Sequence, residues 1–155
     1  MSTKRSVVAA VLVSLVSGMA LAQAADPHVG TWKLNPEKSK GSAFTSGTVT
    51  IEPAGDGLKV TVDLVGQDGA PSQWGFTVTY DGMDHPITGN NPFGDTLALT
   101  RVDARTGRAT YKHGGKVTVT QTTAVSEDGK TRTVTTKGTN AKGQPVDSMT
   151  FYDKQ

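Results

Sequence analysis

The feature that most constrains this chain is a two-residue alternation of apolar and polar side chains. It is clearest over residues 58–64 and 74–80, where Leu, Val, Trp, Phe and Tyr alternate with Lys, Thr, Asp and Gly. Successive side chains of a β-strand point to opposite faces, so this period predicts strands with one dry face. Residues 117–120 repeat it with valine against threonine, and residues 148–151 with Met and Phe against Ser and Thr. We predict apolar residues inside and threonine outside.

Glycine-bearing turns separate these segments at short intervals, at 54–57, 66–69, 80–84, 104–107, 112–115, 126–129 and 140–143. Between them the pattern predicts strands over 30–34, 45–52, 58–65, 72–80, 83–87, 96–103, 109–113, 116–126, 131–137 and 146–153. No segment long enough for a substantial helix has a 3.6-residue apolar period. A single helical turn is expected over residues 35–38, with Asn35 as its cap and Pro36 at the first helical position.

The predicted fold is all-β, a single up-and-down antiparallel β-barrel of eight to ten strands. Short sequential strands must cover their edges, and closing into a barrel does so. Residues 56–81 and 128–153 share one order of features: an Asp-Gly turn, a strand, a polar turn ending in Gly-x-Pro, and a strand closing on Tyr-Asp. Either a duplication or the common pattern of hairpins produces such a repeat.

The first 24 residues have the three parts of a secretory signal peptide. Lys4 and Arg5 are basic, residues 7–22 are mostly apolar, and Ala22-Gln23-Ala24 supplies small residues for cleavage before Ala25. A membrane span needs about 20 apolar residues, so cleavage is favoured over an uncleaved anchor. The expected product is a periplasmic or secreted protein without a stable membrane anchor, whose barrel domain covers residues 25–155.

The charge balance and the cysteine content limit which partners and cross-links are expected. Lys4 and Arg5 are two of the 16 basic residues, so 14 basic residues face 14 acidic ones from Ala25 onward. No clustered basic face is visible, so no nucleic-acid partner is expected. The chain has no cysteine and therefore no disulfide. About 130 residues suffice for one domain with its own core, and a monomer is expected.

Gly30-Thr31-Trp32, within "VGTWKLN" at 29–35, resembles the Gly-x-Trp of lipocalins and the "GTWKL" of fatty-acid-binding proteins. Together with "YDG…PITG" (80–89) and residues 126–146, it is similar to small secreted bacterial proteins described as lipocalin-like, of the calycin type. The resemblance implies a structural role for Gly30 and Trp32, with Trp32 plugging the closed end of the barrel. It also implies that Arg132, on a late strand, forms a cation–π contact with that ring.

The chain departs from the better known members at several points. Fatty-acid-binding proteins carry an Arg-x-Tyr clamp on the last strand, where this chain has Tyr152 but no arginine. Residues 35–44 are too few for their two-helix lid. Avidin-like proteins use several pocket tryptophans, whereas only Trp32 and Trp74 are present here. Neither of those binding mechanisms is expected.

Residues suited to catalysis are few. The histidines fall in an N-terminal tail (His28), a loop (His85) and a turn (His113). Asp81, Asp84 and His85 have side chains that bind metals, but a solvated turn is favoured, so no metal and no cofactor is predicted. The chain has no serine nucleophile elbow, Cys-His pair or phosphate-binding glycine loop. An enzyme is not predicted.

The predicted function is non-catalytic binding of a small hydrophobic or amphipathic ligand inside the barrel. Arg101 shares strand parity with Leu97 and Leu99, so it either meets an anionic head group inside or extends out through the barrel mouth. The alternative is a side-chain-filled barrel that acts through its loops as a protein-interaction or inhibitor module, and a cavity of a few hundred Å³ would favour the ligand. The expected lining is Leu58, Val60, Val62, Trp74, Phe76, Val78, Leu97, Leu99, Val117 and Val119, with Tyr80 and Arg101 as polar groups.

Overall fold

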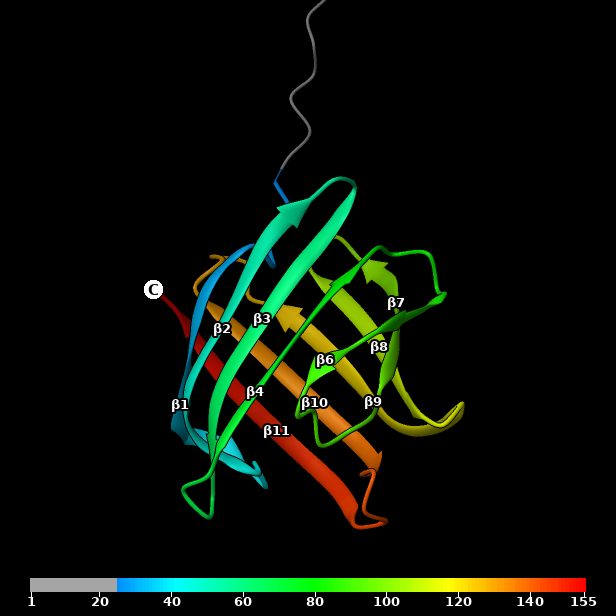
Figure 1. Ribbon diagram of the computed structural model, residues 1–155. Coiled ribbons are helices and arrows are strands. Elements are labelled where there is room, and N and C mark those ends of the chain that lie inside the picture. The colour runs from blue at the N-terminus through cyan, green and yellow to red at the C-terminus, as the bar shows by residue number, and fades with distance from the viewer. Residues whose placement is uncertain (1–24) are drawn as a thin grey trace, which may run out of the picture.

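Eleven strands, each antiparallel to its neighbours, follow one another around a nearly closed barrel in the computed structural model (Figure 1). The predicted all-β, up-and-down barrel is thereby confirmed. The structure describes residues 25–155; the predicted signal peptide lies outside this range and stays a prediction. Within this range no helix is both long and apolar enough to cross a bilayer. The strands are β1 (Gly30–Lys40), β2 (Phe44–Ala54), β3 (Gly57–Gly66), β4 (Pro71–Val78), β5 (Asp84–Pro86), β6 (Thr88–Gly89), β7 (Thr96–Asp103), β8 (Thr106–His113), β9 (Lys116–Val125), β10 (Thr131–Thr139) and β11 (Pro145–Lys154).

The barrel closes at two places. The first and last strands pair, with Trp32 opposite Lys154, so the two ends of the described chain meet in one ladder. The other closure is the segment 84–89. The predicted strand 83–87 corresponds to β5, which pairs with β7, and the short strand β6 just after it pairs with β4. β6 was not predicted, and it makes eleven strands, one more than the upper limit of the prediction.

The expected helical turn at residues 35–38 does not form; these residues belong to β1. Pro36 has no amide hydrogen to donate to a ladder, and the pairing of β1 with β11 is interrupted between Asn35 and Lys40. Side chains fill the interruption: the Ser39 hydroxyl donates to the Asn35 carbonyl (2.7 Å) and accepts from the Phe151 amide (2.9 Å). The sequence therefore makes a bulge here instead of a helix.

The core confirms the alternation over residues 58–64 and 74–78. On β3 the even-numbered residues are buried, with Leu64 only 2% exposed, while Lys59, Thr61 and Asp63 are exposed. Trp74 and Val78 are buried on β4, and Phe76 packs against the same cluster. Trp32 and Val119 are fully buried. The inward faces of β1 to β4 thus follow from hydrophobicity alone.

On β11 the predicted orientation is wrong. Thr150 and Tyr152 are buried, whereas Met149 is 41% exposed. The register gives the reason: Thr150 lies directly opposite the buried Val134 of β10, and residues opposite each other in an antiparallel pair share a face. Serine and threonine are therefore inside this strand and methionine outside.

The prediction that Val117 lines the interior is also wrong. This residue shares parity with the fully buried Val119 but is 54% exposed. The ladder between β8 and β9 shifts register between Thr110 and Lys112, next to this position. Val117 lies beyond that irregularity, at the end of its strand, so it does not contribute to the interior.

Candidate functional site

Trp32 is fully buried, next to the barrel end that residues 26–29 cover. Its indole Nε1 donates a hydrogen bond to the His28 carbonyl (2.8 Å), and the Lys154 ammonium lies 5.3 Å from its ring centroid. Gly30 permits this approach, since a Cβ there would lie 2.7 Å from the Lys154 Cε. The burial predicted for Trp32 is confirmed, but the cation beside it is Lys154. Arg132, expected there from the resemblance, lies instead over the Tyr152 ring, 5.6 Å from its centroid.

His28 is not in a free tail; it is only 4% exposed. The segment 26–29 folds onto the barrel end, where the amides of His28 and Val29 donate to Asp26 (2.9 and 3.0 Å). Burial, and next the positive charge of Arg132, lower the pKa of His28 to about 4. The imidazole is therefore neutral at neutral pH, and its Nε2 has no hydrogen-bond partner among residues 25–155.

Asp26 also holds the predicted polar groups Tyr80 and Arg101. Its Oδ2 accepts from the Tyr80 hydroxyl and from Arg101 Nη2, each at 2.7 Å, and the Arg101 guanidinium lies 3.9 Å from the Tyr80 ring centroid. Burial raises the pKa of Asp26, but the hydrogen bonds from Tyr80, the His28 amide and Arg101 outweigh it and hold the pKa below its ordinary value. The Arg101 side chain is 38% exposed. It lies at the barrel end that residues 26–29 cover and does not point into the interior, so the inward position considered from the sequence is not the one it takes.

Two cavities lie inside the barrel. The larger has a volume of about 120 Å³ and the smaller, beside His28, about 60 Å³. Val60, Phe76, Tyr111, Gln121 and Arg132 line both, so they form a waist between the two spaces. The larger cavity is also lined by loop residues Gly41, Ala43, Pro92 and Asn140, which place it toward the end of the barrel away from Trp32.

Most of the predicted lining is found at these cavities. Val62 and Trp74 line the larger cavity, and the smaller is lined by Leu58, Val78, Tyr80, Leu97 and Leu99, in addition to the Val60 and Phe76 of the waist. Val119 is buried but lines neither cavity, Val117 is exposed, and Arg101 also lines neither. Hydrophobic parity therefore locates the apolar lining and fails at strand ends.

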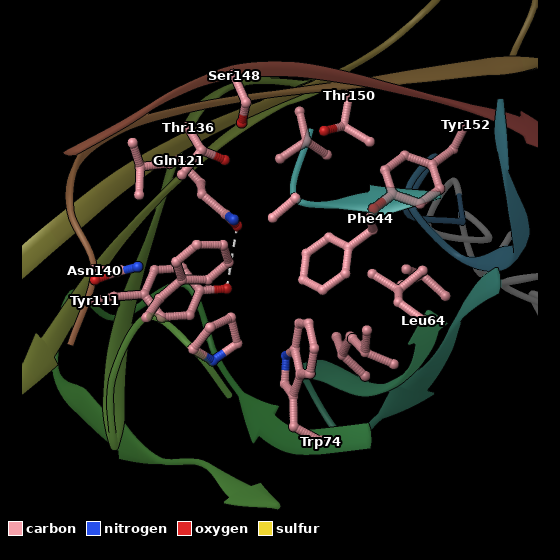
Figure 2. Close-up of a pocket in the computed structure, with 18 of the residues that line it drawn as sticks. Phe44, Leu64, Trp74, Tyr111, Gln121, Thr136, Asn140, Ser148, Thr150 and Tyr152 are labelled. Atoms are coloured by element: carbon pink, nitrogen blue, oxygen red, sulfur yellow. Dashed lines mark hydrogen bonds between the residues drawn. The ribbon is translucent and has the colours of Figure 1, made fainter. Parts of the chain in front are cut away.

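The larger cavity has two chemically different walls (Figure 2). The apolar wall comes from β2, β3 and β4 and consists of Phe44, Val62, Leu64, Trp74 and Phe76. The polar wall faces it and consists of Gln121, Thr136, Asn140, Ser148 and Thr150. Figure 2 also shows the hydrogen bond from the Tyr111 hydroxyl to the Gln121 Oε1 (3.1 Å). This arrangement suits a molecule with an apolar body and polar substituents on one side.

Two hydrogen-bond donors at the larger cavity lack acceptors within residues 25–155. They are Trp74 Nε1 and Arg132 Nε, both buried. The Arg132 guanidinium forms no ion pair with the described residues, and its Nε has no hydrogen-bond partner among them. Burial lowers the pKa of Arg132, yet a guanidinium remains charged throughout the ordinary pH range. The waist thus holds a positive charge without a counter-ion.

The metal-binding alternative at residues 81–85 does not assemble in the structure. His85 Nε2 lies 3.0 Å from Asp81, but Asp84 pairs with the Lys112 ammonium (2.9 Å). Among residues 25–155 there is no group of three or more His, Cys, Asp or Glu side chains placed to hold a metal ion. Hydrogen bonds from Thr79, His85 and the Met83 amide lower the pKa of Asp81.

Sequence reasoning missed the polar wall. Thr136 shares strand parity with Val134, and Ser148 and Thr150 share parity with Tyr152. The sequence does not show that Val134 and Tyr152 are buried, because a strand with apolar residues on both faces does not reveal which face is inward. Phe44 and Tyr111 were missed for a simpler reason: each stands outside the alternating runs that define the other strands.

Comparisons with protein-family models, with curated proteins and with solved structures find no match for this chain. What is established is therefore the architecture: a nearly closed, all-β barrel of eleven antiparallel strands. A fold of this kind serves many functions, so function must be argued from the cavity and its side chains.

Proposed function

We propose that this protein is an exported, monomeric, lipocalin-like binding protein that holds a small, partly apolar molecule inside its barrel without transforming it. The observation that carries the proposal is the larger cavity, whose apolar wall faces a polar wall. Ligand sites in proteins are mostly apolar and use a few polar groups to orient what they bind. The apolar wall supplies the apolar surface, and the polar wall supplies the groups that orient the ligand.

The volume limits the size of the ligand. A dry apolar cavity of about 150 Å³ holds benzene, whereas drug-sized ligands need roughly 300–1,000 Å³. A cavity of about 120 Å³ is smaller than the few hundred Å³ expected for a typical ligand site. By the comparison with benzene it holds at most about six non-hydrogen atoms, and a larger molecule needs the smaller cavity beyond the waist, of about 60 Å³, as additional room.

Binding is preferred over catalysis because of the side chains that meet there. The polar wall offers hydroxyls and amides, and Arg132 offers a fixed positive charge. None of these is paired with a base in the way that activates a nucleophile. The side chains at the larger cavity are therefore suited to orienting a ligand.

Neutral ligands test the proposal directly. Toluene and benzyl alcohol, titrated into the protein, should shift the amide resonances of residues on both walls in heteronuclear NMR spectra. Ser148→Phe places a ring in the larger cavity and should abolish these shifts. Thr135→Phe, one strand away and outside the barrel since it pairs with the exposed Met149, should leave them unchanged. Absence of binding by the wild type would favour the alternative, a filled barrel that acts through its loops.

A further inference from the structure

We propose that the ligand is a small organic anion, a carboxylate whose charge lies against Arg132. This inference rests on the proposed function and specifies the chemical class that the same cavity selects. The juxtaposition that carries it is a half-buried guanidinium, with its Nε buried and no counter-ion, at the waist between two cavities.

The charge of Arg132 is unbalanced inside the barrel. No carboxylate oxygen of residues 25–155 lies within 4.0 Å of the guanidinium, and neither Asp nor Glu lines the two cavities. Across the ladder Arg132 faces Tyr152 on β11 and Val125 on β9, neither of which carries a negative charge. A buried, unpaired charge costs several kcal/mol, and an anion in the cavity would remove most of that cost.

Arg101 provides the contrast. Its guanidinium has a carboxylate at 2.7 Å and an aromatic ring at 3.9 Å, so its electrostatic needs are met within the chain. Arg132 has the aromatic contact, with Tyr152, but not the carboxylate. The partner that Arg101 finds in Asp26 is the one that Arg132 lacks.

The other unpaired donor favours the same class of ligand. Trp74 Nε1 lies on the apolar wall with no acceptor among the described residues. A ligand that enters with oxygen acceptors satisfies such donors, whereas a cationic ligand would be repelled by Arg132. A carboxylate bound at the waist would also direct its apolar body along Phe76 and Val60 into the larger cavity. Its size is limited to short chains or one ring by the volume given above.

Pairs of ligands that differ only in charge test this inference. Butyrate and 1-butanol, and benzoate and benzyl alcohol, are titrated into the protein by NMR or calorimetry. Each carboxylate should bind about tenfold or more tightly than its alcohol, because a charged hydrogen bond contributes roughly 1.5–3 kcal/mol. Arg132→Met should weaken carboxylate binding by about 10- to 100-fold and change alcohol binding by no more than about threefold. The matched control Arg101→Met should leave both affinities unchanged.

The outcomes separate the two proposals. If the alcohols bind and the carboxylates bind no more tightly, the anion inference is overturned while the proposed function stands. If neither class binds, both are overturned. If Arg132→Met does not fold, the wild type still decides: the Arg132 Nε–H resonance should shift on addition of benzoate and stay in place with benzyl alcohol. An unshifted resonance in the presence of bound benzoate would place the anion elsewhere.

Discussion

The hairpins β3–β4 and β10–β11 are built from the same order of features but present opposite chemistry to the interior. In each, an Asp-Gly turn precedes a strand, and Tyr-Asp comes at or just after the end of the second strand, as Tyr80-Asp81 after β4 and Tyr152-Asp153 in β11. Both closing tyrosines contact the interior cavities. At corresponding inward positions, the first hairpin has Val60, Leu64, Phe76 and Val78, where the second has Arg132, Thr136, Ser148 and Thr150. One backbone pattern thus builds either wall, and the inward residues alone decide whether it is apolar or polar.

The two hairpins share the order of their sequence features, but their strands pair in different registers. Val60 lies opposite Phe76, whereas Arg132 lies opposite Tyr152 and not opposite Ser148, the residue that corresponds to Phe76. The Arg132–Tyr152 pair is a product of this different register. It places the guanidinium beside an aromatic ring at the waist of the barrel.

The largest expected effect concerns Trp32, the fully buried residue of a strand that lies between the two hairpins. Trp32 lies on β1, which pairs with β2 on one side and β11 on the other. Trp32→Ala should lower the free energy of unfolding by about 3–5 kcal/mol, as large aromatic deletions from a core do. Urea denaturation measures this, with the exposed neighbour Lys33→Ala as the control. A midpoint unchanged from wild type would mean that Trp32 does not contribute to the stability of the barrel.

A second prediction compares corresponding positions of the hairpins. Leu64→Ala, on the apolar wall, should cost about 2–5 kcal/mol because it removes buried apolar surface and leaves a cavity. Thr136→Val, at the corresponding position of the polar wall, should change the free energy of unfolding by less than about 1 kcal/mol, since it keeps the shape and removes a hydroxyl without a hydrogen bond among the described residues. Equal losses in the two variants would show that the polar wall is held together by its hydroxyls.

The difference between the hairpins also explains what the sequence could predict. Residues 58–64 have apolar side chains at one parity only, so their inward face and their place in the cavity lining could be predicted. Residues 148–152 have Ser and Thr at one parity and Met and Phe at the other, with Tyr152 on the polar side. Only the pairing of Thr150 with Val134 decides between them. The polar wall therefore depends on register, which a single sequence does not specify.

Two further residues depend on contacts between distant parts of the chain. His28 was assigned to a tail because nothing local shows that residues 26–29 cover the barrel end. Arg101 has the right parity for the interior, but it lies near the end of β7 and reaches Asp26, 75 positions earlier in the chain. The unpaired charge of Arg132 likewise depends on which groups surround it. The barrel was predictable, whereas the charges of its site were not.

A third prediction uses His28 to detect the charge of Arg132. The pKa of His28 falls from an ordinary 6.5 to about 4 in the folded state, so the unfolded state takes up a proton that the folded state refuses. Stability is therefore highest above pH 6.5 and falls as the pH drops from 6.5 to 4, by at most about 3 kcal/mol. His28→Gln should remove this decrease, and His113→Gln, at an exposed turn, should retain it.

A variant of Arg132 measures how much its charge contributes to this pH dependence. After burial, its positive charge is the next cause of the lowered pKa of His28, and Asp26 and Arg101 act on the same ring with opposite signs. Arg132→Met should raise the pKa of His28 and make the loss of stability at low pH smaller. An unchanged pH dependence in that variant would show that the guanidinium does not reach the imidazole electrostatically.

The smallest expected effect distinguishes the two arginines by its sign. Arg101→Met removes a partly exposed ion pair and a ring contact, and it should lower the free energy of unfolding by about 1 kcal/mol or less. Arg132→Met removes a half-buried charge without a counter-ion, so stability should be equal or greater. Urea denaturation in about 0.1 M salt measures both, and about 1 M salt should reduce the effect of Arg101 while leaving that of Arg132, because salt screens exposed charges far more than buried ones. Equal losses in the two variants would mean that Arg132 has a stabilising partner in the free protein, and the waist would then have no unpaired charge to offer a ligand.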